Sequence, residues 1–232
     1  MIKNFLLLFG LLLAFVSSAQ ENFRLETEVT IKEVNTSKNQ NILWKGHIYY
    51  NKPDAKLLYD FSFPKPIKWL FTEESVYDIR RDTIMNETEN ISGLESTLFY
   101  LGLENLLSKY GFDNTIYELS ETKREDDLVI SVWKPKGVYS GAFGDVHVSI
   151  KNGLLHGVLT FNKDGELSKK QFFRKYEKIG NAMFPTELVE MINLEGGGEL
   201  KRLTTYNDIK LNQFSNEAFY NFDVSGLVIS DD

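Results

Sequence analysis

The chain has 232 residues, no cysteine and a formal net charge of −7. The lack of cysteine excludes a disulfide-stabilised scaffold, and the acidic balance argues against nucleic-acid binding, which needs a basic surface. Aromatic residues make up 13% of the chain, which indicates an aromatic-rich interior or ligand surface.

The N-terminal segment predicts export. Lys3 precedes an apolar run from Phe5 to Val16, and Ser17 to Ala19 supply the small residues of a cleavage site before Gln20. The run is shorter than the roughly 20 residues of a membrane span, so residues 1–19 are typical of a secretory signal peptide. We expect residues 20–232 to form a single domain, a monomer without a transmembrane span.

Two alternating apolar runs around a polar turn predict a β-hairpin over Ile42–Phe63. One face of this hairpin, continued by the next strand, carries unusually large side chains. A face this bulky either fills an ordinary core or lines an apolar cavity against a helix. Its residues are Trp44, Ile48, Tyr50, Tyr59, Phe61, Trp69 and Phe71.

One main helix is predicted over Ser92–Lys109. Ser92 and Glu95 have the spacing of a capping box, and Gly111 stands where a helix-ending glycine is expected. Apolar side chains cover more than half of the helix circumference, so we expect the helix to be enclosed against the concave face of a strongly curved sheet. Those facing the hairpin are Leu98, Phe99 and Leu101.

Most of the remaining chain predicts antiparallel strands. Residues 82–90 are polar and predict a loop, whereas Asn152-Gly153 is a favoured two-residue hairpin turn. The total is ten or eleven strands, so the fold class is mainly β (α+β).

Candidate catalytic residues are few. Folding the second hairpin evenly on Asn152-Gly153 places Asp145, His147 and His156 on one face, where they could bind a metal or simply form a solvent-facing polar surface. No nucleophile, phosphate-loop or zinc-protease motif is present. We therefore predict no catalytic residue, no metal and no cofactor. The same folding gives an apolar opposite face of Val146, Val148, Ile150, Leu155, Leu159 and Phe161.

Several segments together resemble a known family, the periplasmic LolA-like carriers of outer-membrane lipoproteins. The resemblance covers most of the chain after the signal peptide. It implies an unclosed, strongly curved antiparallel β-barrel covered by helices, with an apolar cavity for acyl chains. The matching segments are Trp44–Pro53, Tyr59–Pro64, Ser92–Lys109 and Asn207–Val228, with Asn212, Phe222 and Gly226–Ile229 in the ending.

The resemblance implies a non-enzymatic periplasmic carrier or chaperone in lipoprotein sorting and protein transport. Its ligands would be acyl chains or lipid-modified proteins, received from an inner-membrane donor and passed to an outer-membrane acceptor. The family's functional arginine aligns with Lys52, which we expect at the cavity rim, and its closing proline is replaced by Val224. A relative that binds another lipid, an adaptor or sensor, or a structural module with a filled core and a protein partner also fits the pattern.

Overall fold

The computed structural model describes residues 23–90, 93–107, 110–112 and 115–230, and one large sheet organises them. The predicted signal peptide, Ser92 and Lys109 lie outside the described residues.

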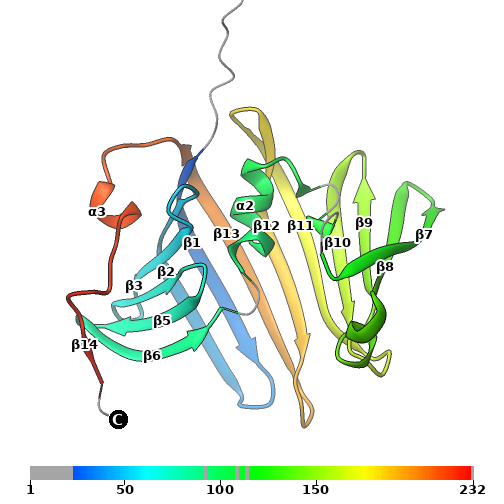
Figure 1. Ribbon diagram of the computed structural model, residues 1–232, viewed down its shortest axis with the longest axis horizontal. Helices are drawn as coiled ribbons and strands as arrows, with labels where there is room; N and C mark the ends of the chain where they lie inside the picture. The colour runs from blue at the N-terminus through cyan, green and yellow to red at the C-terminus, as the bar shows by residue number, and fades with distance from the viewer. Residues whose placement is uncertain (1–22, 91–92, 108–109, 113–114, 231–232) are drawn as a thin grey trace, which may run out of the picture.

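The sheet contains fourteen strands in the order β14-β6-β5-β4-β3-β2-β1-β13-β12-β11-β10-β9-β8-β7. Neighbouring strands are antiparallel, except that β14 and β6 are parallel. The two end strands do not pair with each other, so the sheet curves around a hollow without closing (Figure 1). The strands are β1 (Arg24–Asn35), β2 (Gln40–Asn51), β3 (Lys56–Phe63), β4 (Ile67–Phe71), β5 (Ser75–Arg80), β6 (Thr83–Glu89), β7 (Tyr117–Glu125), β8 (Leu128–Pro135), β9 (Val146–Lys151), β10 (Leu154–Phe161), β11 (Leu167–Ile179), β12 (Ala182–Asn193), β13 (Glu199–Leu211) and β14 (Val228–Ile229).

The prediction of ten or eleven strands is therefore too low. Strand β6 occupies the polar stretch predicted as a loop, and β14 adds a short strand beside it. Within β6 only Ile84 is buried, while the residues from Met85 onward are exposed. A strand near the sheet edge buries little of its side-chain surface, so its sequence lacks the alternation that marks the other strands.

The predicted helix over Ser92–Lys109 is also wrong in extent. The structure has a 3₁₀ turn, η1 (Leu94–Ser96), followed by a short helix, α2 (Leu98–Leu103). Thr97 separates the two with an extended backbone, and its hydroxyl accepts a hydrogen bond from the Tyr100 amide at 3.3 Å. Thr97 is therefore the N-cap of α2, five residues after the predicted N-cap Ser92.

The end of α2 has a Schellman arrangement. Asn105 takes the left-handed conformation, with φ of 56°. Its amide donates to the Gly102 carbonyl at 3.3 Å, and the Leu106 amide donates to the Leu101 carbonyl at 2.8 Å. Asn105, rather than the predicted Gly111, is thus the residue that ends the helix, since asparagine also tolerates this conformation.

The second predicted hairpin forms, but its register changes within β10. Ile150 pairs with Leu155 as predicted, and a bulge at His156 then shifts the later pairs by one residue. Val158 instead of Leu159 therefore lies in the core, and Phe161 turns to the same side as His147, with ring centroids 4.8 Å apart. Even pairing through the whole hairpin was the wrong assumption, because a bulge reverses the facing of every later side chain.

The first predicted hairpin, over Ile42–Phe63, is confirmed as β2 and β3. Gly46 allows the two strands to approach closely, because a Cβ at this position would lie 2.2 Å from the Asp60 carbonyl oxygen. The bulky face of the hairpin contributes to the main hydrophobic core, together with α2. Phe99 on α2 contacts three rings there, with centroid distances of 6.4 Å to Tyr50, 6.0 Å to Phe184 and 5.6 Å to Tyr206.

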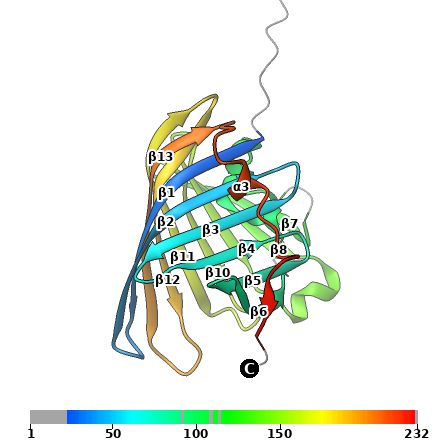
Figure 2. The same cartoon turned by 90° about the vertical axis from the view of Figure 1, so that its left-hand side faces the viewer.

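A second core lies on the opposite, convex face, under the chain that follows β13. This C-terminal segment includes α3 (Glu217–Tyr220) and crosses the outer face of the sheet (Figure 2). Tyr49 stacks on Phe219 at 4.7 Å between ring centroids. Both faces of β2 to β4 are thus covered, which the sequence pattern did not predict. The buried residues of this core are Tyr49, Leu58, Leu70, Ile79, Ile84 and Tyr220.

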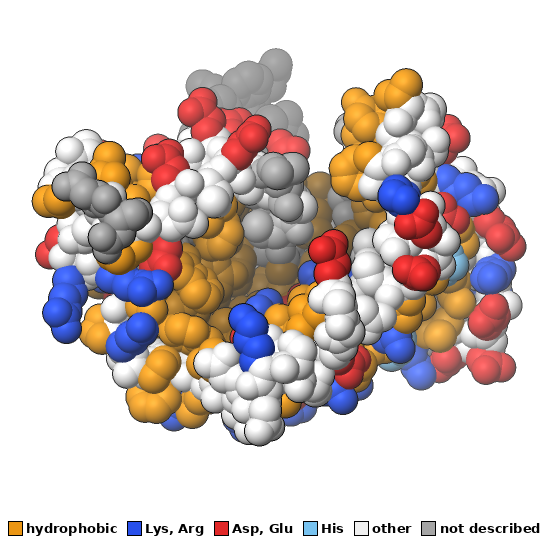
Figure 3. Space-filling view, turned by 90° about the horizontal axis from the view of Figure 1, so that it is seen from below, with side chains coloured by type: hydrophobic (Ala, Val, Ile, Leu, Met, Phe, Trp, Pro, Cys, Tyr) orange, Lys and Arg blue, Asp and Glu red, His pale blue; other side chains and the backbone are white. Residues whose placement is uncertain are grey.

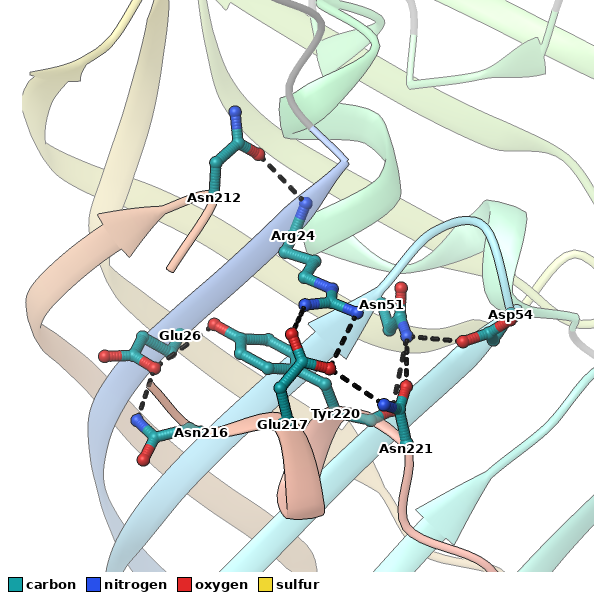
Figure 4. A network of polar contacts seen from close by, with 9 residues as sticks. All are labelled: Arg24, Glu26, Asn51, Asp54, Asn212, Asn216, Glu217, Tyr220 and Asn221. Atoms are coloured by element: carbon teal, nitrogen blue, oxygen red, sulfur yellow. Dashed lines mark hydrogen bonds and ion pairs between the residues drawn. The ribbon is translucent and has the colours of Figure 1, made fainter. Parts of the chain in front are cut away.

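Polar contacts attach the C-terminal segment beside this core (Figure 4). Arg24 forms an ion pair with Glu217, and its guanidinium lies 4.9 Å from the centre of the Tyr220 ring. The Tyr220 hydroxyl hydrogen-bonds to Glu26 at 3.2 Å, and the Asn216 amide donates to the same carboxylate at 2.7 Å. The segment is therefore held by a buried tyrosine whose ring and hydroxyl both have partners.

Replacing Tyr220 tests this attachment. Tyr220→Ala should lower the free energy of unfolding by about 3–5 kcal/mol, as expected for deletion of a buried ring. The exposed Tyr139 provides a control, since Tyr139→Ala should change stability by less than about 0.5 kcal/mol. Urea unfolding at pH 7 measures both values. Equal stability of the two variants would show that the C-terminal segment is not part of the cooperative fold.

Candidate ligand cavity

A cavity of about 270 Å³ lies between the η1–α2 segment and the concave face of the sheet. Viewed from below, the molecule is hollowed here, and hydrophobic side chains line much of the hollow (Figure 3). The lining combines aromatic residues of β2 to β4 with polar residues of β1 and β11 to β13. The lining residues are Ile31, Glu33, Trp44, Tyr59, Trp69, Phe71, Ser96, Thr97, Leu98, Phe99, Tyr110, Gln171, Phe173, Leu188, Glu190, Arg202, Thr204 and Tyr206.

Six of the ten residues predicted for the cavity line it. Trp44 and Trp69 form its aromatic wall, with ring centroids 5.6 Å apart. The other lining residues of this set are Tyr59, Phe71, Leu98 and Phe99. The remaining four are almost fully buried in the surrounding core and do not line the cavity: Ile48, Tyr50, Phe61 and Leu101.

The opposite wall carries a charged network that the sequence analysis missed. Arg202 on β13 donates two hydrogen bonds to Glu33 on β1, at 2.8 and 3.1 Å, and one to Glu190 on β12 at 3.4 Å. Glu190 also pairs with Lys169 at 3.0 Å and accepts a hydrogen bond from Gln171 at 3.1 Å, both on β11. The available signal was a charged residue at a position that continues an inward-facing apolar pattern, as Glu33 does after Val29 and Ile31. It could not be read without the strand register that brings β1, β13, β12 and β11 side by side.

Burial and charge oppose each other at Glu190. Burial favours the neutral acid, but the attraction and hydrogen bonds of Lys169 and Arg202 outweigh it, and the pKa of Glu190 lies below its ordinary value. For Arg202, burial acts against the charge, but Glu33 and Glu190 raise the pKa of its guanidinium. Glu190 and Arg202 are therefore both charged at neutral pH, although they face an apolar wall.

Two tyrosine hydroxyls open onto the cavity without a hydrogen bond to the described residues. Tyr59 and Tyr206 both line the cavity, and Tyr206 is 5% exposed. Burial is the main cause that raises the pKa of both phenols, so both are neutral donors. Tyr110, in contrast, donates its hydroxyl proton to Gln171 at 3.0 Å, and burial raises its pKa to about 12.

Lys52 lies at the turn between β2 and β3, where the Lys52 amide donates to the Phe23 carbonyl at 2.9 Å. Its ammonium forms an ion pair with Glu104, the residue that follows α2. The pair connects the sheet rim directly to the segment that covers the cavity. Neither Lys52 nor Glu104 is among the residues that line the cavity, so a place for Lys52 at the cavity rim stays a prediction.

The histidines do not assemble a metal site in the described part of the chain, where no group of three or more His, Cys, Asp or Glu side chains is placed to hold a metal ion. His147 contacts Phe161, and His156 contacts Phe172 with ring centroids 6.4 Å apart. The pKa of His147 lies below its ordinary value, because burial lowers the pKa by more than the nearby Asp145 raises it. The bulge at His156 removes the even pairing on which a metal site would have depended.

Comparison with solved structures supports this architecture. A LolA superfamily protein from Nitrosomonas europaea aligns with a TM-score of 0.57 at 15% identity, over 85% of this chain and 90% of that one. The fold is LolA-like. A DUF1329-family protein from Desulfovibrio piger aligns with a TM-score of 0.58 at 14% identity, over 88% of this chain and 91% of that one.

A third structure, a domain from Vibrio parahaemolyticus named for outer membrane lipoprotein sorting, has a TM-score of 0.57 at 12% identity and covers 85% and 89% of the two chains. No family model and no curated protein matches the sequence. Among the described residues of this LolA-like fold, none of the helices is both long and apolar enough to cross a membrane.

Removing the charge of Glu190 tests the network. At pH 7, Glu190→Gln should lower the free energy of unfolding by about 1.5–3 kcal/mol, because Lys169 and Arg202 lose charged hydrogen bonds. The folded-state pKa of Glu190 is depressed, so its contribution is present above the unfolded pKa of about 4.5 and disappears as the pH falls through the folded value. Urea unfolding at pH 7 and pH 3 should therefore show a difference from wild type that shrinks in acid.

Asp208→Asn is the control, because Asp208 and its partner Lys210 are both exposed. This substitution should cost less than about 1 kcal/mol at either pH. A Glu190→Gln protein as stable as wild type at pH 7 would contradict the electrostatic assignment.

Proposed function

We propose that this protein is a non-enzymatic periplasmic carrier that binds acyl chains, free or attached to lipid-modified proteins, in the cavity beneath α2. The supporting observation is an aromatic wall that remains open to free volume inside the molecule instead of being fully packed. Burial of an acyl chain there is favoured by about 25 cal/mol for each Å² of apolar surface removed from water. In this proposal residues 1–19 are the signal peptide, and residues 20–232 form one lipid-binding domain.

The size of the cavity implies that α2 moves on loading. Its volume of about 270 Å³ lies just below the range of about 300–1,000 Å³ that is usual for ligand pockets. A long acyl chain therefore needs more room, and displacement of the segment from Leu94 to Leu103 would supply it. This segment is short and is joined to the sheet rim by the Lys52–Glu104 pair, so it can act as a lid.

Native mass spectrometry of protein purified from an envelope extract tests the proposal most simply. A co-purifying lipid or acylated protein supports the carrier function. A single stoichiometric protein partner without lipid, and no uptake of a fluorescent fatty-acyl probe, would instead favour an interaction module with a filled core.

Trp44 should contribute to both binding and stability. Trp44→Ala removes one side of the aromatic wall and should weaken binding of a fatty-acyl probe by about tenfold or more. Trp133 is the matched control, because it is buried outside the cavity lining. Trp133→Ala should destabilise the protein by about 3–5 kcal/mol yet leave the affinity of the folded protein unchanged. Equal loss of affinity in both variants would argue against binding at the aromatic wall.

Lys52 should control exchange of the ligand. Lys52→Leu removes the ion pair with Glu104, so loading and release of the probe should both accelerate, by up to about fivefold if the pair contributes about 1 kcal/mol. Stability should change by less than about 1 kcal/mol, since both side chains are partly exposed. Stopped-flow fluorescence measures the rates. Lys68→Leu, which removes a similar ion pair with Asp60, should leave the loading and release rates unchanged. Unchanged rates in Lys52→Leu would contradict a role of the Lys52–Glu104 pair in ligand exchange.

A further inference from the structure

The polar wall of the cavity has spare hydrogen-bonding capacity. A cavity for hydrocarbon alone gains nothing from buried polar groups, because an unpaired buried group costs free energy. Here such groups face the same space as Trp44 and Trp69. Tyr206 is only 5% exposed, and its hydroxyl makes no hydrogen bond to the described residues. The hydroxyl of Tyr59 makes no hydrogen bond to them either.

Both hydroxyls reach free space inside the cavity. In the described part of the chain, two side-chain polar atoms are both fully enclosed and without a hydrogen-bond partner, Arg24 Nε and Asn51 Oδ1. The hydroxyls of Tyr59 and Tyr206 also lack a partner but are not in this group, so neither hydroxyl is fully enclosed by protein. The two phenols also lie close enough for Tyr59 to affect the pKa of Tyr206. Both phenols line the same cavity as Trp44 and Trp69.

Arg202 adds donors to the lining of the same cavity. A guanidinium carries five N–H groups, and three hydrogen bonds from Arg202 go to Glu33 and Glu190. The two remaining N–H groups, with the phenolic protons, give the site an excess of donors. Glu33 Oε2 and both oxygens of Glu190 are already engaged, so the unpartnered donors outnumber the one remaining carboxylate oxygen, Glu33 Oε1. A ligand group that accepts hydrogen bonds is therefore favoured over one that donates them.

The charge of the lining decides between neutral and anionic acceptors. The charged side chains that line the cavity are Glu33, Glu190 and Arg202, which sum to one negative charge. Lys169 pairs with Glu190 and brings the whole network to neutrality, so an ionised carboxylate or phosphate would be buried there without a counter-charge of its own. A carbonyl oxygen of an ester or amide accepts hydrogen bonds without adding charge.

We propose that Tyr206, Tyr59 and Arg202 form a subsite for the ester or amide carbonyl of an acylated ligand, with its hydrocarbon chain against Trp44 and Trp69. This inference rests on the proposed carrier function and deepens it, since it makes the cavity selective for esterified or amide-linked acyl groups over free fatty acids. Selectivity arises at the head of the chain and is separate from the apolar affinity.

The test compares four ten-carbon probes that share one chain: the methyl ester, the ionised acid at pH 8, the primary amine and the plain alkane. Displacement of a bound fluorescent acyl probe measures each affinity. We expect the ester to bind about tenfold more tightly than the acid, the amine and the alkane. Tyr206→Phe should weaken ester binding by about 3- to 10-fold, the usual worth of one hydrogen bond, and leave alkane binding unchanged.

Tyr49→Phe is the matched control, because Tyr49 lies in the convex core and does not line the cavity. It should leave all four affinities unchanged. If all four probes bind equally, or Tyr206→Phe leaves ester binding unchanged, the carbonyl subsite is wrong while the carrier function stands. Tighter binding of the acid or amine also overturns the subsite. If none of the probes binds, the carrier function and the subsite both fail.

Discussion

The position of one aromatic ring, Phe99, determines how the two walls of the hollow are held apart. Phe99 is almost fully buried and contacts Tyr50 on one side and Phe184 and Tyr206 on the other. Because β2 and β12 are separated in the sheet by β1 and β13, this ring connects strands that do not pair with each other. This packing bounds the cavity beside α2, so displacement of α2 on loading would have to separate Phe99 from these rings.

The C-terminal segment supplies the second constraint, on the opposite face of the same strands. Strands β2 to β4 carry aromatic side chains toward the hollow and apolar side chains toward Tyr220 and its neighbours. Covering the convex face stabilises the strands without filling the hollow. The cavity can therefore remain partly empty, because the strands that form its aromatic wall are also anchored from behind.

Local patterns in the sequence predicted some of these features and missed others for physical reasons. Trp44 and Trp69 occupy alternate positions within short strand patterns, which are local, so the sequence predicted the aromatic wall. The network of Glu33, Glu190 and Arg202 depends on pairing between distant strands, which no local pattern encodes. The end of α2 was missed because Asn105 adopts a left-handed conformation in place of a glycine, and the bulge at His156 changed a register that the turn alone had suggested.

Quenching of tryptophan fluorescence tests the central claim that an acyl chain occupies the space beside the aromatic wall. Of the three tryptophans, Trp44 and Trp69 line the cavity and Trp133 does not, so Trp133→Phe leaves reporters only at the proposed site. Titration of this variant with a fatty-acyl ester brominated along its chain should quench its emission saturably, and the unbrominated ester should reverse the effect. Weak, unsaturable quenching that the unbrominated ester does not reverse would contradict binding in the cavity.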